Sequence, residues 1–382
     1  MIIDNKTKIK LIQKTLKQNK SVNIKAIGNS MFPLIKNNQK IQIIPKKFPD
    51  IKTYDIVVIK HGNTIIIHQC LFKSQKHLVT FGINNKFIDP PALPKQILGI
   101  IKTSNYWQII NILYATELKK LSLLTSDKIP FLILKGAPWQ KHIFGHFLNK
   151  PTCDIDILIK RKNYITIKNK LIKLGYKQHQ SPCINPKHYS KQIPSISEIS
   201  FSKTKNNITF TIDLHLLAIR NALNPYFQKP ITLKKMQKLT NKFWKSTKKQ
   251  KDNILYLQNE YLLFYLCLNF IFHHATRDIN ILSYIAVVID KQKIDWKNFW
   301  KLAKKYKVSN FVYYPLGWTS RLFKIPIPSL KKHQPTIPRR LFAKLFINHY
   351  TIFRPFRQLG SKIVPGKLNV LIISILRLIL NE

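Results

Sequence analysis

The stretch Cys153-Asp154-Ile155-Asp156-Ile157-Leu158-Ile159 places two carboxylates one residue apart in a short apolar run. This spacing predicts a β-strand, in which alternate side chains leave the same face, so that Asp154 and Asp156 point together while the isoleucines enter a core. Two neighbouring carboxylates repel and raise each other's pKa unless a cation lies between them. Because Mg²⁺ prefers oxygen ligands, the stretch predicts a magnesium site.

A third carboxylate and a glycine turn support the same interpretation. Residues 208–214 are expected to form a neighbouring strand, whose Asp213 would add a third oxygen ligand. Residues 130–134 read as a buried strand, and Lys135-Gly136 then turns the chain into a helix. A glycine at such a turn lets backbone amides approach phosphate oxygens, and Lys135 would add a positive charge there. His215 is interpreted as structural and as pointing to the opposite face of its strand.

These motifs together resemble a known family. Leu134-Lys135-Gly136, Asp154-x-Asp156, the Gly175-Tyr176 that ends the next helix and Asp213-Leu-His215 are similar to the uncharacterised bacterial branch of the nucleotidyltransferase superfamily. The resemblance implies a mixed sheet and Mg²⁺-dependent transfer of a nucleoside monophosphate from an NTP to an acceptor. Lys150 stands where that family usually has arginine. It would still offer a positive charge to the nucleotide, but not the two parallel hydrogen bonds of a guanidinium group.

The first hundred residues carry a different pattern. Short β-rich runs separated by turn residues predict a small all-β domain. Within it, Gly28-Asn-Ser30-Met31-x-Pro33 resembles the nucleophile motif of the signal peptidase and SOS-repressor serine peptidases, a resemblance that covers residues 22–102. It implies that Ser30 is the nucleophile, that His68 takes its proton and that Asp89 orients the imidazole. The family's paired Gly-Asp is replaced by Asn38-Gln39, and Ile83 stands where an aspartate is usual.

Composition limits the function classes. Against 65 lysines and arginines stand 16 acidic residues, which gives a formal charge of +49 and attracts anions at low salt. The excess is nearly all lysine and is spread along the chain, so it is only weak support for nucleic-acid binding and resembles a compositional drift. The four cysteines are scattered and predict neither zinc nor a disulfide framework, which favours a reducing cytoplasm.

Neither end of the chain reads as a membrane span. Residues 1–23 lack an apolar core for a secretory signal, and the apolar stretch 368–380, about 13 residues long, is too short to cross a bilayer. That stretch is interpreted as a helix that docks on the core, and contact with an anionic membrane surface is the alternative. A cytoplasmic location is therefore expected, with membrane association left open.

The predicted organisation has four parts. Residues 1–105 form the peptidase-like domain, 106–250 an α/β (α+β) nucleotidyltransferase core, 251–330 its helical C-terminal part, and 331–382 a basic, proline-containing tail with an apolar terminal helix. The leading hypothesis is a nucleotidyltransferase acting in the maturation of a peptide or secreted product. The first alternative is a cytoplasmic serine peptidase that cuts itself or a leader peptide, with the transferase domain as a substrate-binding module. The second is a basic binding scaffold whose two sites have decayed.

Overall fold

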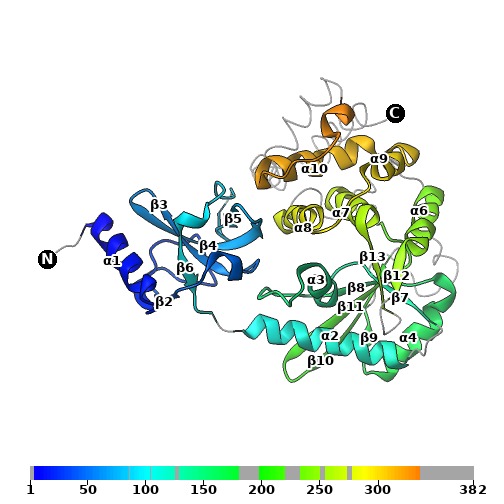
Figure 1. Cartoon of the computed structure of the whole chain (residues 1–382). Coiled ribbons are helices and arrows are strands. Elements are labelled where there is room, and N and C mark those ends of the chain that lie inside the picture. Colours follow the sequence, from blue (N-terminus) through cyan, green and yellow to red (C-terminus); the bar gives the residue numbers. More distant parts are fainter. Residues whose placement is uncertain are drawn as a thin grey trace, which may run out of the picture. The chain divides into compact units, whose positions relative to one another are not determined.

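The chain forms a mixed α/β protein with two β-sheets, as the sequence predicts (Figure 1). The computed structural model describes residues 4–85, 87–103, 105–124, 129–179, 198–219, 233–249, 254–272 and 278–335. The chain divides into two compact units. The first unit consists of Met1–Gln108, Leu148–Lys150 and Ser320–Ile325, and the second of Ile109–Phe147, Pro151–Thr319 and Pro326–Glu382.

The first unit is an antiparallel sheet of short strands with one amphipathic helix. The strand order is β1-β2-β6-β3-β4-β5, and every neighbouring pair is antiparallel. Helix α1 begins after Asp4, whose carboxylate accepts a hydrogen bond from the backbone N–H of Thr7 at 3.0 Å and so caps the helix. The elements are α1 (Asn5–Lys17), β1 (Val22–Lys25), β2 (Lys40–Ile44), β3 (Ile56–His61), β4 (Thr64–Lys73), β5 (Leu78–Phe81) and β6 (Ile97–Ile101), with short 3₁₀ helices at Phe48–Asp50 and Pro94–Gln96.

Two apolar clusters form the core of this unit. One includes Ile12 and Leu16 of α1 together with Ile43 and Val58 of the sheet. The other is built around Val57 and includes Cys70 and Leu78. Because Val57 and Val58 are consecutive in β3, their side chains leave opposite faces, and each face of the sheet carries its own cluster.

The second unit is built on a seven-stranded mixed sheet with the order β12-β13-β7-β8-β11-β10-β9. Strand β8 is parallel to β11, and β13 is parallel to β7, whereas the other neighbouring pairs are antiparallel. The strands are β7 (Phe131–Ile133), β8 (Ile155–Leu158), β9 (Lys177–Gln178), β10 (Glu198–Lys205), β11 (Ile208–His215), β12 (Thr247–Lys249) and β13 (Ile254–Leu257). The predicted acidic strand is therefore central in the sheet.

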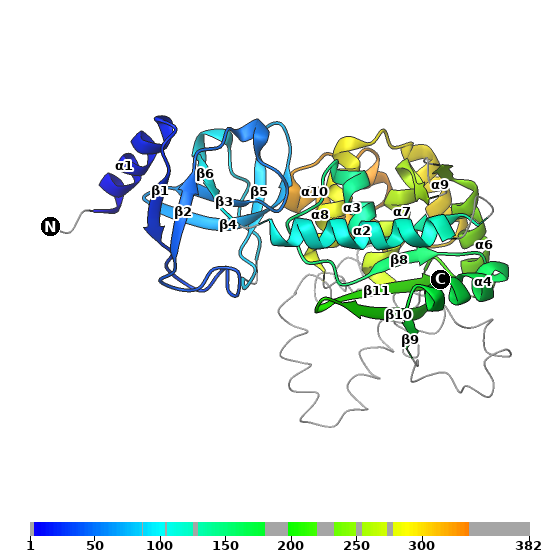
Figure 2. The same cartoon turned by 90° about the horizontal axis from the view of Figure 1, so that it is seen from below.

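Helices cover this sheet on both faces. In Figures 1 and 2, α2 and α4 lie on one side of the sheet, and α7 and α8 lie on the other. Helix α7 is apolar around its circumference and is buried from Leu262 to Ile271, as expected of a helix inside a core. The helices are α2 (Tyr106–Leu124), α3 (Ala137–Phe144), α4 (Tyr164–Lys173), α6 (Leu233–Lys245), α7 (Asn259–Phe272), α8 (Ile279–Lys291), α9 (Trp296–Lys305) and α10 (Ser309–Phe323), with 3₁₀ helices at Arg161–Asn163 and Leu330–His333.

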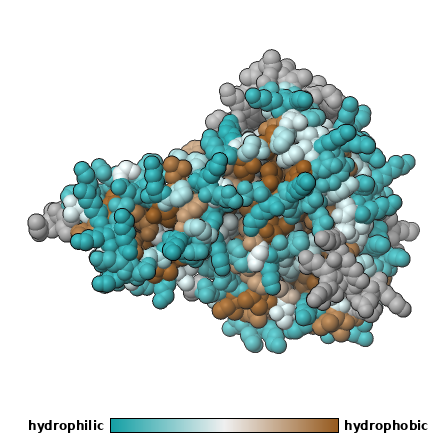
Figure 3. Space-filling view, in the orientation of Figure 1, coloured by the Kyte–Doolittle hydropathy of each residue, from teal (hydrophilic) through white to brown (hydrophobic). Residues whose placement is uncertain are grey.

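One face of the molecule can be followed in a space-filling view. Figure 3 shows hydrophilic side chains over much of the face it presents, with hydrophobic patches between them. Among the described helices, none combines the length and apolarity needed to cross a bilayer. The predicted terminal helix at 368–380, with its alternative contact to a membrane surface, and most of the predicted tail lie outside the described residues.

Candidate functional site

The predicted carboxylates gather on one face of the second sheet. Asp156 in β8 is paired in register with Asp213 in the parallel strand β11, so both side chains point to the same face. Asp154 immediately precedes β8, two residues from Asp156, and belongs to the same face. Asp156 is 3% exposed and Asp213 is 9% exposed, so both carboxylates are buried.

Two cations contact Asp156. The Nζ atom of Lys135 lies 3.4 Å from Oδ2 of Asp156, and Nε2 of His215 lies 2.7 Å from Oδ1. Burial is the largest single effect and would lower the pKa of Lys135, but the charge of Asp156, together with those of its neighbours, raises that pKa above its ordinary value. Burial opposes the charge of His215 as well, yet its hydrogen bond to Asp156 raises the pKa of the imidazole. Both side chains therefore favour their cationic form beside this carboxylate.

The position of His215 corrects a prediction made from the sequence. His215 was expected on the opposite face from Asp213, but residues two apart in a strand share a face. The hydrogen bond to Asp156 places the imidazole within the carboxylate cluster. The spacing Asp213-x-His215 was the signal that could have identified it.

The carboxylates also perturb one another. Burial, reinforced by the charge of Asp156, raises the pKa of Asp154 to about 6, against the opposing effect of Lys135. Burial likewise raises the pKa of Asp213, although a hydrogen bond with Ser200 opposes that change. The Oδ1 atom of Asp213 is buried and has no hydrogen-bond partner among the described residues. A cluster with raised pKa values and an unsatisfied oxygen favours the binding of a cation.

The glycine turn lies against the start of the acidic strand. Gly136 has a φ of +103° and a ψ of −177°, a backbone conformation that is almost restricted to glycine. A Cβ at this position would lie 2.9 Å from the carbonyl oxygen of Asp154 and 3.0 Å from Cα of Ile155. Gly136 thus allows α3 to begin directly beside β8, and its carbonyl accepts the hydrogen bond from the N–H of Gln140.

The donor atoms fit a hard divalent cation in kind. Three carboxylates supply oxygen only, and Oδ1 of Asp213 is buried with no hydrogen-bond partner among the described residues. In the described ranges, however, no three His, Cys, Asp or Glu side chains are arranged closely enough to hold a metal ion. Asp156 contacts Lys135 and His215 instead. The structure therefore shows a charged cluster around Asp156, and magnesium binding by the triad stays a prediction.

Lys150 is grouped by the structure with the first unit. Its Nζ atom lies 5.2 Å from the ring centroid of Tyr54, which is a cation–π distance. Its contact with nucleotide phosphates, expected from its place four residues before Asp154, stays a prediction.

The first unit contains a second cluster. The Oγ atom of Ser30 lies 3.0 Å from Nε2 of His68, and Nδ1 of His68 lies 2.6 Å from Oδ2 of Asp89. His68 lies within β4 and is 7% exposed, Ser30 lies in the turn region between β1 and β2, and Asp89 follows β5. Three residues from separate parts of the chain thus form a continuous hydrogen-bonded row.

Two further residues support this row. The hydroxyl of Thr80 donates a hydrogen bond of 2.6 Å to Oδ2 of Asp89, the same oxygen that faces His68. A Cβ at Gly82 would lie 2.8 Å from Nε2 of His68, so the imidazole occupies the space that a side chain at position 82 would need. The sequence alone did not assign a role to Thr80 or Gly82.

Comparison with known proteins identifies one family. A family model described as "Uncharacterised nucleotidyltransferase" matches residues 88–324, which include the carboxylate cluster, Lys135 and His215. No curated protein and no solved structure matches the chain. Ser30 and His68 lie outside the family match and Asp89 lies just inside it, so the serine peptidase interpretation depends on the motif and the geometry of its residues. The match spans more than half of the 382 residues, and the chain belongs to the family of uncharacterised nucleotidyltransferases.

Proposed function

We propose that the second unit transfers a nucleoside monophosphate from an NTP to a hydroxyl group of an acceptor. The family implies a transferase with a nucleotide substrate, and the cluster around Asp156 supplies the chemistry. The observation that carries the proposal is that Asp156 is in register with Asp213 while Lys135 and His215 hold its two oxygens. Buried charges at this density cost stability, and a functional site is the usual reason for keeping them.

The residues have distinct roles in this proposal. Asp154, Asp156 and Asp213 would bind Mg²⁺, which when bound neutralises phosphate charge and stabilises the oxygens of the attacking and leaving groups. Lys135 is a half-buried cation beside the glycine turn, suited to a phosphate oxygen of the NTP. Gly136 lets the first backbone amides of α3 approach the same phosphates. His215 orients the carboxylate of Asp156 through its hydrogen bond.

The test uses the purified full chain with MgCl₂ and each NTP labelled at the α-phosphate. Transfer of label or Mg²⁺-dependent retention of the nucleotide is expected in the parent, with at least a hundredfold loss when Asp154 and Asp156 are both replaced by alanine. Asp213→Asn is the companion variant, because it removes the negative charge of this buried side chain while keeping its size. Equal labelling of the parent and of both variants would refute the proposal.

A matched control keeps folding separate from chemistry. Asp290 lies in α8 and is exposed, so Asp290→Asn removes one charge from the same unit without touching the cluster. This variant should label as the parent does. Thermal unfolding of each variant shows whether a loss of labelling has a structural cause.

The first unit supports a second candidate function, serine peptidase chemistry. The row from Ser30 through His68 to Asp89 has the contacts needed for a base to take the serine proton and for a carboxylate to orient that base. Thr80 fixes the oxygen of Asp89 that faces the imidazole. Peptide-bond cleavage, either within this chain or in a leader peptide, is the reaction that such a row performs.

A fluorophosphonate probe tests this candidate without knowledge of the peptide, because it reacts with activated serine hydroxyls. The parent should be labelled at Ser30, and Ser30→Ala should abolish the labelling. Gly82→Ala should reduce it at least tenfold, because the added Cβ would meet Nε2 of His68 at 2.8 Å. Gly62→Ala is the matched control, since a Cβ at that glycine meets no atom within 4 Å. Labelling of the parent no stronger than that of Ser30→Ala would exclude an activated serine. If both units fail their tests, the remaining interpretation is a binding scaffold.

A further inference from the structure

Helix α6 carries a row of lysines along one face. Lys235, Lys238, Lys242 and Lys245 are three, four and three residues apart, and at 3.6 residues per turn they fall within about a quarter of the helix circumference. The opposite face buries Leu239, Thr240 and Phe243. The row is therefore held in a fixed orientation by the packing of α6.

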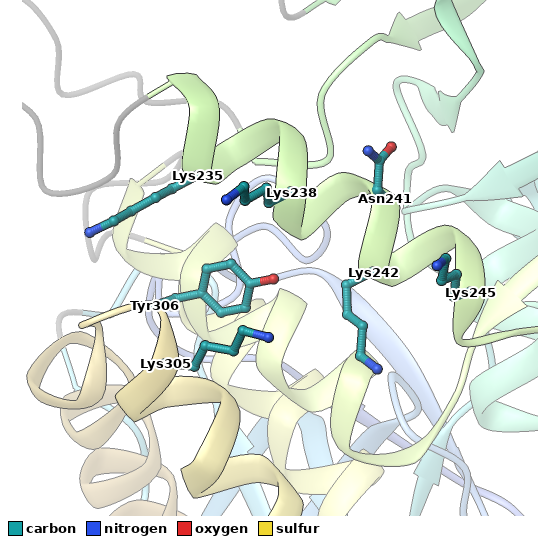
Figure 4. A pocket seen from close by; sticks show the side chains of 7 residues that line it. All are labelled: Lys235, Lys238, Asn241, Lys242, Lys245, Lys305 and Tyr306. Atoms are coloured by element: carbon teal, nitrogen blue, oxygen red, sulfur yellow. The ribbon is translucent and has the colours of Figure 1, made fainter.

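A cavity of about 440 Å³ lies between this row and the end of α9. Its lining consists of the four lysines and Asn241 of α6, together with Lys305 and Tyr306. Figure 4 shows Lys305 and Tyr306 facing the lysine side of α6. We call this feature the α6–α9 groove.

The described lining of the groove is positively charged. Five of its seven described residues are lysines, and neither a carboxylate nor an arginine is among these seven. In the described part of the chain, none of the ion pairs involves Lys238, Lys242, Lys245 or Lys305. Burial raises the pKa of Tyr306, so its hydroxyl keeps its proton and can donate a hydrogen bond. The lining thus offers donors and positive charges to an anion.

The length of the row indicates an extended anion. From Lys235 to Lys245 the helix rises by about 15 Å, at about 1.5 Å per residue. Along one strand of a stacked nucleic acid, a phosphate charge recurs about every 3.4 Å of helix axis, so a row of this length can face several successive phosphates. Lysine ammonium groups bind phosphates as point charges, and the described lining supplies five of them.

We propose that the α6–α9 groove binds the phosphate backbone of a single-stranded nucleic acid. A basic groove of this kind can follow the backbone of one strand, as grooves that bind single-stranded nucleic acid do. Binding is independent of base sequence, because phosphate contacts carry no sequence information. It does not depend on the proposed nucleotide transfer, since the carboxylate cluster is not part of the lining.

Fluorescence anisotropy of a labelled 12-nucleotide oligouridylate, titrated with the full chain in the absence of NTP, tests the proposal. In the test variant, Lys235, Lys238, Lys242 and Lys245 are all replaced by glutamine, which keeps helix propensity. The matched control replaces Lys6, Lys10, Lys14 and Lys17, which are exposed on α1, by glutamine. Both variants lose the same charge from one helix, so they separate a local site from the overall charge of +49.

We expect the α6 variant to bind at least tenfold more weakly at 50 mM salt and the α1 variant to bind within about twofold of the parent. The slope of log K against log salt should become less steep by about 3, since about four phosphate contacts are lost at about 0.7 each. Equal weakening in both variants would overturn the proposal in favour of a chain-wide charge effect. Displacement of the RNA by an equimolar oligoglutamate peptide would overturn it in favour of an acidic peptide. Competition by equimolar inorganic tripolyphosphate would overturn it in favour of a small anion.

Discussion

Replacing Asp154 with asparagine should make the second unit more stable at neutral pH. Burial and then the charge of Asp156 raise the pKa of Asp154 from 3.8 to about 6, so the folded state holds this proton more tightly than the unfolded state does. Ionisation of Asp154 therefore opposes folding. Below pH 3.8 this cost is absent, it grows as the pH rises from 3.8 to 6, and it is complete above 6. At pH 7 it amounts to about 3 kcal/mol, and at pH 4 to about 0.6 kcal/mol.

Urea unfolding at pH 4 and pH 7, followed by tryptophan fluorescence, measures this difference. In Asp154→Asn no buried carboxylate has to ionise. The free energy of unfolding of this variant should therefore exceed that of the parent by about 3 kcal/mol at pH 7 and by less than about 1 kcal/mol at pH 4. The control Asp290→Asn alters an exposed carboxylate of α8 and should stay within about 0.5 kcal/mol of the parent at both values. A variant that is less stable than the parent at pH 7, or equally stabilised at both pH values, would refute the reasoning.

The same measurement connects stability with the proposed cation. A divalent cation that binds only the folded state stabilises it by RT ln(1 + [L]/Kd), and it binds the carboxylates in their ionised form. Addition of MgCl₂ should therefore stabilise the parent more at pH 7 than at pH 4. Asp154→Asn should lose most of this gain, so that excess Mg²⁺ narrows the difference between the two proteins.

Two further changes test the framework of the second unit by urea unfolding. Gly136→Ala should cost about 3 kcal/mol or more, because alanine disfavours this φ and its Cβ would meet the carbonyl of Asp154 at 2.9 Å. The control Gly145→Ala, whose Cβ would have no atom within 4 Å, should cost about 1 kcal/mol. Equal losses in the two variants would contradict the steric argument. Glu117→Ala should cost about 3 kcal/mol, because it leaves the ammonium of Lys203 in a largely buried position without its ion-pair partner. A loss below 1 kcal/mol would show that this pair is effectively solvated.

The sequence predicts the individual strands of the transferase site better than it predicts how these strands pair in the sheet. Alternation and the flanking apolar residues predict the strands around Asp156 and Asp213, which the structure places at 155–158 and 208–215. The register that sets Asp156 opposite Asp213 joins positions far apart in the chain. It depends on the order of strands in the sheet, and this order cannot be predicted from the local pattern of apolar and polar residues.

The contacts of Asp156 show the same limit at the level of side chains. Lys135 was expected to face the phosphates of a nucleotide, and the strand alternation was wrongly applied to His215. The structure directs both to Asp156, at 3.4 Å and 2.7 Å. The side-chain conformations in a crowded cluster depend on the charges of all its members. A sequence motif can therefore identify the residues of the cluster without showing which of them form ion pairs.

The α6–α9 groove could not be read from the sequence at all. The lysines of 235–245 are separated by apolar and uncharged polar residues, and they do not differ from the lysine-rich background of the chain. Only the helical period brings four of them to one face, and only the packing of α9 adds Lys305, about sixty residues later, to the other side. Lysines that are spread evenly along the sequence can thus be gathered on one surface when the chain folds. This is why the charge alone was weak support for nucleic-acid binding, whereas its arrangement in the groove is a specific and testable reason for it.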